Sequence, residues 1–225
     1  MPKVKNRDPL WYLLGASVLS IVLSFIPLAR MVVYPIRLFV TFIHEGGHAA
    51  AAILTLGQVD KLHVYLDASG TTLTRGGFGL VIASAGYLTS TAFGAALLII
   101  GSQAERAKAA LTASAGLIVL TAFLAGDLTT FVMGIVLALG LVGVTILVSH
   151  DTANFLLSFL AVQCCLNAFL DLQTLFVIST TTNVHSDVAN MAQMTFIPAA
   201  FWAVFWLVIS AIAFIFALRS YARHL

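Results

Sequence analysis

The chain has 225 residues, of which 60% are hydrophobic and only 9% are charged, and its formal net charge is +2. Soluble domains are about one quarter charged, so this composition excludes an ordinary soluble globular protein. The few Lys and Arg residues are scattered, which excludes a basic surface for nucleic acid. We therefore expect a single membrane-embedded domain over residues 1–225.

Long apolar runs dominate the chain. A helix needs about 20 apolar residues to cross a bilayer. After a basic N-terminal tail at 1–9, such runs occupy 10–29, 31–56, 78–100, 110–124, 131–148, 154–178 and 196–218. We expect an all-α polytopic membrane protein with six to seven transmembrane helices. Lys3, Lys5 and Arg7 favour a cytoplasmic N-terminus.

The segment 58–77 is the one long polar stretch, and it lies between the second and third apolar runs. Val59, Lys61, His63 and Tyr65 alternate with their neighbours at period two, which indicates a strand. A turn signal at 67–70 and β-branched residues at 71–74 follow. The pattern predicts a small β-hairpin at the membrane surface.

The second apolar run contains His44-Glu45-Gly46-Gly47-His48. Histidines at positions i and i+4 share one helix face, so both imidazoles can bind one zinc ion. A glutamate after the first histidine can act as general base on a metal-activated water. Such groups are costly inside a membrane unless they have a function. We predict a Zn²⁺ site with Glu45 as the catalytic base. The two glycines leave room for another backbone or a substrate to come close.

A catalytic zinc site takes a third protein ligand beside a water. Asp171 is the acidic residue that lies well inside an apolar run, at a depth that matches His48 if both helices point the same way. It is the favoured third ligand. Other candidates remain open, and these are His63, Asp127, Asp151, His185 and Asp187.

Two residues share the helix face of Asp171, and these are Asn167 and Cys164. They are possible outer-sphere neighbours of the metal. His185 and Asp187 lie in the polar stretch 180–190 and are possible substrate contacts.

These features together resemble the site-2 protease family of intramembrane zinc metalloproteases, in the small bacterial branch without a PDZ domain. The resemblance rests on His44–His48 in a span, the strand pair after it, and the stretch 167–172 around Asp171. It implies that Asp171 is the third zinc ligand. The family's Gly-Pro-x-x-Asn stretch corresponds here to 86–90, so Gly86 and Ser90 are expected near the site. Ser186-Asp187 is similar to a pair in the small members.

The resemblance implies hydrolysis of transmembrane or membrane-associated protein substrates in the bilayer of a bacterial cell membrane. A second interpretation is a metal-binding membrane protein without peptidase activity, either a transporter or a regulatory pseudoenzyme. A third is a purely structural membrane protein, which leaves Glu45 without a role.

Overall fold

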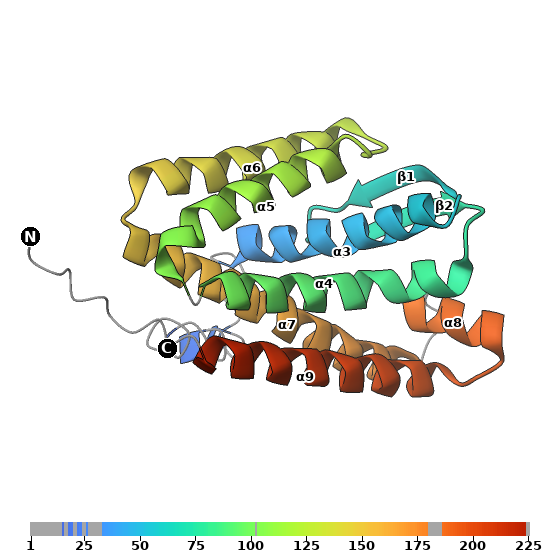
Figure 1. The fold of residues 1–225 in the computed structure, drawn as a ribbon. Helices are drawn as coiled ribbons and strands as arrows, with labels where there is room; N and C mark the ends of the chain where they lie inside the picture. The colour runs from blue at the N-terminus through green and yellow to red at the C-terminus, as the bar shows by residue number, and fades with distance from the viewer. Residues whose placement is uncertain are drawn as a thin grey trace, which may run out of the picture.

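The computed structural model describes residues 33–101, 103–179 and 186–223, with isolated positions between 15 and 26. For residues 167–179 and 222–223 the description is limited to the helical backbone. This part of the chain is mostly helical, with seven α-helices and a two-stranded hairpin (Figure 1). The expected span at 10–29 lies almost wholly outside the described residues.

Helix α3, Tyr34–Leu54, carries the His-Glu-x-x-His motif and confirms the helix expected over 31–56. Pro35 stands in its first turn, where the missing amide proton has no helical partner to lose. The two motif glycines are sites of close packing. A Cβ on Gly46 would lie 2.8 Å from Thr121 Oγ1, and one on Gly47 would lie 2.9 Å from the Ala85 carbonyl oxygen. The expected close approach of another backbone is therefore confirmed at Gly47, whereas Gly46 makes room for the Thr121 side chain.

The predicted hairpin is also confirmed. Strand β1, Gln58–Val64, pairs antiparallel with β2, Gly70–Arg75, and a register shift falls between Val59 and Lys61. The chain leaves β2 through Gly76 and Gly77, which both have φ above +70°, a region that glycine adopts without strain. The Phe78 amide then donates to Thr55 Oγ1 at 3.0 Å. This bond joins the end of α3 to the start of the next helix.

Six helices follow the hairpin, and these are α4, Gly79–Gly101; α5, Ala107–Ala122; α6, Leu128–Leu147; α7, His150–Ser179; α8, Asp187–Thr195; and α9, Ala199–Arg223. By length and composition, three of the described helices can cross a membrane: α4, α6 and α9 over Ala199–Tyr221.

Two polar segments between the expected apolar helices are helical in part. The segment 103–108 forms a 3₁₀ turn, Ala104–Arg106, and then enters α5. His150 and Asp151 belong to the first turn of α7 rather than to a loop. Ser149 explains the second case, because its Oγ accepts from the Thr152 amide at 3.2 Å as an N-terminal cap. An acidic Asp151 in the first turn also suits the helix dipole.

Helix α8 was not expected, since residues 180–190 read as a polar loop. Ser186 caps its N-terminus by accepting from the Ala189 amide at 3.4 Å, and Asp187 begins its first turn. Val188 and Met191 are buried on its inner face. They pack in a cluster with Tyr87 of α4 and Trp206 of α9. Tertiary packing thus fixes a helix too short to be stable alone.

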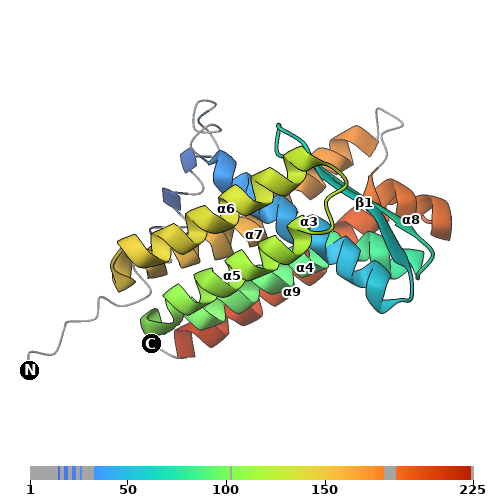
Figure 2. The ribbon, with the colours of Figure 1, turned by 90° about the horizontal axis from the view of Figure 1, so that it is seen from above.

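The helices form a bundle in which α4 packs against α3, α7 and α9, while α5 pairs with α6 (Figures 1 and 2). The hairpin and α8 lie at the same end of this bundle, beside the C-terminal half of α3. The motif, the hairpin and α8 are therefore brought together at one end of the bundle.

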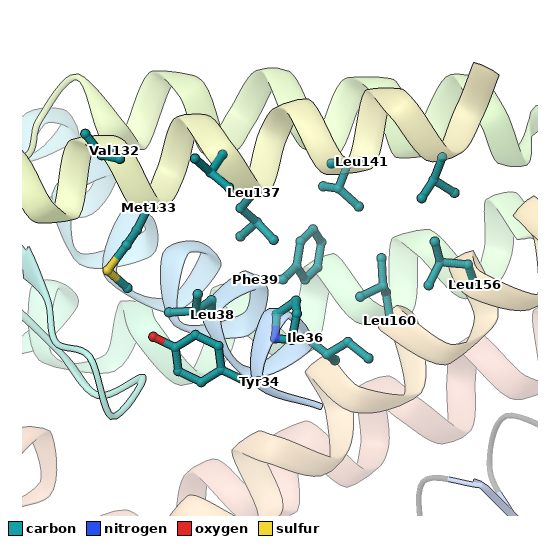
Figure 3. A pocket seen from close by; sticks show the side chains of 14 residues that line it. Tyr34, Ile36, Leu38, Phe39, Val132, Met133, Leu137, Leu141, Leu156 and Leu160 are labelled. Carbon is teal, nitrogen blue, oxygen red and sulfur yellow. The ribbon is translucent and has the colours of Figure 1, made fainter. Parts of the chain in front are cut away.

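A cavity of about 580 Å³ lies between α3, α6 and α7. Figure 3 shows Phe39, Leu141 and Leu160 on its walls, one from each helix. The lining is almost entirely apolar, which suits hydrocarbon, and it includes none of the motif residues. The motif residues therefore lie outside this cavity.

Candidate metal centre

The two motif histidines converge on one point. His44 and His48 lie one helical turn apart on α3, and their Nε2 atoms are 3.1 Å apart. The rings meet edge to face with centroids 4.8 Å apart. This is the shared face that the i, i+4 spacing predicts.

Asp187 completes a triad of donor atoms. Its Oδ2 lies 3.3 Å from His44 Nε2 and 3.2 Å from His48 Nε2. The carboxylate comes from the first turn of α8, more than 130 residues away in sequence. Sequence reasoning had treated Asp187 only as a possible substrate contact and a minor candidate ligand.

The three atoms fit one tetrahedral metal ion. Zinc binds imidazole nitrogen and carboxylate oxygen at about 2.0–2.2 Å, so two donors on a tetrahedron are about 3.3 Å apart. The three separations here are 3.1, 3.2 and 3.3 Å. Such a near-equilateral triangle occupies one face of the tetrahedron. Held by these three donors alone, a metal ion would keep a fourth position for a water, as a catalytic site requires.

The surroundings of the histidines fix their rings. His48 Nδ1 lies 2.6 Å from the Ile82 carbonyl oxygen and donates to it, which leaves Nε2 with a free lone pair for a metal. The His44 ring rests edge-on against Tyr87, with centroids 4.8 Å apart. Tyr87 in turn stacks on the fully buried Trp206. Helix α4 therefore contacts both imidazoles, and α9 supports the Tyr87 ring that packs on His44.

Gly86 of α4 faces the two ring nitrogens directly. A Cβ placed on it would collide with Nε2 of both His44 and His48. Because Gly86 has no side chain, this position has space for the two nitrogen atoms and for a metal that they bind. The expectation that Gly86 lies near the site agrees with this geometry.

Glu45 is buried beside the triad, with 5% of its surface exposed. Its carboxylate is covered by β2, where Thr72 Oγ1 donates to Oε2 at 2.6 Å. A buried acidic side chain with one defined donor is suited to act as a base on a nearby water.

The charge and exposure of Asp187 suit a metal ligand. Burial works against ionisation of the Asp187 carboxyl, but the adjacent His48 and His44 rings hold its pKa below its ordinary value. An ionised carboxylate is the form in which an aspartate binds a metal. The side chains of His44 and Asp187 keep 17% and 20% exposure, so the cluster is not sealed from outside.

Three residues singled out in the sequence lie outside what the structure describes. The side chains of Asn167 and Asp171 fall within the part of α7 known only as backbone, and His185 falls in the undescribed segment 180–185. The proposal of Asp171 as third ligand therefore stays a prediction.

The remaining candidates occupy other places. Ser90 is buried one turn beyond Gly86, and Cys164 is buried in the main core, where its Cβ comes within 2.9 Å of a Cβ built on Gly94. His63 pairs with Asp127, with Nδ1 and Oδ2 2.7 Å apart, where β1 meets the start of α6. Asp151 is exposed in the first turn of α7.

A local signal for Asp187 did exist. Ser186 followed by an acid is a typical N-cap pattern, and Val188 with Met191 gives the i, i+3 spacing of a buried helix face. That pattern predicts a short helix with an acid at its start. The contact between this short helix and α3 depends on the tertiary fold, which a local pattern does not predict.

Comparison with protein families agrees with this site. The family model described as Peptidase M50B-like matches residues 14–217, which is most of the chain. Comparisons with curated proteins and with solved structures found no match. Peptidases of this kind are zinc enzymes and relatives of the site-2 proteases. The chain belongs to the Peptidase M50B-like family.

Proposed function

We propose that this protein is an intramembrane zinc metalloprotease that hydrolyses peptide bonds of membrane-associated protein substrates. The observation that carries the proposal is the triangle of His44 Nε2, His48 Nε2 and Asp187 Oδ2, with sides of 3.1 to 3.3 Å, beside a buried glutamate. Family membership supports the same reaction.

The membrane setting is part of the proposal. We take α3 and α7 as membrane-embedded together with the three long apolar helices. With the run at 10–29 and the short apolar α5, this makes six to seven crossings, and the N-terminus is placed in the cytoplasm of a bacterial cell. The triad then lies near the membrane face that carries the hairpin and α8.

Each residue has a separate role in hydrolysis. His44, His48 and Asp187 hold the metal. A zinc ion bound there supplies a Lewis acid for the scissile carbonyl and lowers the pKa of water. Glu45 takes the proton from the attacking water and delivers it to the leaving amine. Asp171 remains the alternative third ligand.

The hairpin offers a place for an extended substrate segment. Gly126 N donates to the Leu62 carbonyl oxygen at 2.8 Å, and Leu62 forms a bridge with Ala125, so the outer edge of β1 is occupied. Among the described residues, no backbone hydrogen bond from another element reaches the outer edge of β2. An unwound substrate added to β2 as a third strand would lie beside Glu45, which β2 contacts.

The test is cleavage of a transmembrane substrate by the purified protein and by Glu45→Gln. We expect the wild type to cleave and Glu45→Gln to lose at least about 100-fold in kcat, since general-base catalysis contributes about 10² to 10⁴. Zinc content should stay unchanged. Glu105→Gln is the matched control, because Glu105 is the chain's other glutamate and lies exposed.

Two results would contradict the proposal. Undiminished cleavage by Glu45→Gln would show that Glu45 is not the general base. One zinc per chain in a wild-type protein that cleaves no tested substrate favours a metal-binding protein without peptidase activity.

A further inference from the structure

The carboxylate of Glu45 is held from outside its own helix. Thr72 Oγ1 lies 2.6 Å from Glu45 Oε2 and 3.2 Å from the Glu45 carbonyl oxygen. A hydroxyl has one proton, and the shorter contact to a charged oxygen is the stronger hydrogen bond. One carboxylate oxygen therefore has a donor from β2, and the other, Oε1, has no donor from it.

Gly70 forms a second wall around the same carboxylate. A Cβ built on Gly70 would lie 2.5 Å from Glu45 Oε1 and 2.6 Å from its Cγ. Gly70 and Thr72 are two residues apart on β2, so they share one face of the strand. That face lies directly against the Glu45 side chain.

The hairpin is fastened to the fold by contacts that do not involve Glu45. The Val64 amide donates to Thr130 Oγ1 at 3.0 Å, and Thr41 Oγ1 donates to the Ala68 carbonyl oxygen at 2.7 Å. His63 Nδ1 also lies 2.7 Å from Asp127 Oδ2 at the β1 edge. Thr72 is thus presented to Glu45 by a strand whose position is set elsewhere.

We infer that Thr72 is the positioning residue of the general base. Its hydroxyl binds Oε2 and Gly70 confines the carboxylate on the side of Oε1, so that the carboxylate is held in place for proton transfer. The inference rests on the proposed function. An otherwise flexible glutamate gains a single orientation, and orientation of this kind is worth about 100-fold in rate when a group shifts by 1 Å.

The test compares Thr72→Val, which keeps the shape and removes the hydroxyl, with Thr72→Ser, which keeps the hydroxyl. We expect Thr72→Val to lower kcat roughly 10- to 100-fold with KM and zinc content unchanged. Thr72→Ser should recover kcat to within about threefold of wild type. Thr112→Val is the control, because Thr112 is exposed on α5 and bonds only its own helix at the Lys108 carbonyl.

A second readout needs neither zinc nor activity. In chelator-treated protein, Thr72→Val and Glu45→Ala should each lower the melting temperature, and the double variant should be no less stable than the worse single variant. Such non-additivity is the signature of a direct contact.

The inference is overturned by a Thr72→Val protein with wild-type kcat, by a Thr72→Ser protein as slow as Thr72→Val, or by additive shifts in the melting cycle. Failure of the proposed function gives a different result. In that case the wild type does not cleave the substrate, or Glu45→Gln cleaves it, and the residue at position 72 has no influence on either outcome.

Discussion

At the scale of single residues, the site depends on glycines, which have no side chain, as well as on the residues whose side chains form it. Gly86 faces both Nε2 atoms, and Gly46, Gly47 and Gly70 let neighbouring elements come close to the motif. A glycine in a helix interior costs stability relative to alanine. At these positions the cost is offset by packing that alanine would prevent.

Gly86→Ala tests this point. The added methyl group would collide with both imidazole nitrogens, so at least one ring must move. We expect zinc affinity to fall by at least the roughly 10- to 100-fold seen when a ligand's outer partner is lost, and cleavage to fall with it. Zinc per chain after dialysis against a weak chelator measures the effect.

Gly116→Ala is the control, because a Cβ on Gly116 meets nothing within 4 Å. It should bind zinc normally. A Gly86→Ala protein with wild-type zinc affinity would show that the rings have more room than this geometry allows.

At the scale of elements, α8 delivers Asp187 and is packed against α4 and α9 through its inner face. Met191 is 2% exposed and packs with Tyr87 and Trp206, while Gln193 on the same helix is exposed. The position of Asp187 therefore depends on how firmly the inner face of α8 is packed.

Met191→Ala should loosen α8 and weaken the site. Truncation of a buried methionine costs about 2–5 kcal/mol of stability, and here the loosened helix carries a ligand. We expect both a lower melting temperature and weaker zinc binding. Gln193→Ala, at an exposed position of the same helix, should change neither strongly. Equal zinc affinity in the two variants would mean that α8 does not position a ligand.

The same elements show what sequence could and could not predict. The hairpin and the helix around His44 and His48 follow from period-two and i, i+4 patterns, which are local. Helix α8 has only nine residues and little apolar length, so its polar N-terminal residues resembled a loop. Its contact with α3 joins residues 143 apart in sequence, and no local pattern carries that distance.

At the scale of the whole molecule, a bundle of apolar helices gathers its polar chemistry at one end. The hairpin, α8 and the C-terminal half of α3 meet there (Figure 1). The apolar cavity between α3, α6 and α7 is lined by none of the metal donors. The apolar cavity and the metal donors therefore occupy different parts of the bundle.

The central claim is that Asp187 is the third protein ligand of a zinc ion held by His44 and His48. Zinc content of purified wild type, Asp187→Ala and Asp171→Ala tests it most directly. We predict one zinc per chain in the wild type and in Asp171→Ala, and well below one in Asp187→Ala. Full zinc in Asp187→Ala with loss in Asp171→Ala would contradict the account and assign the ligand to α7.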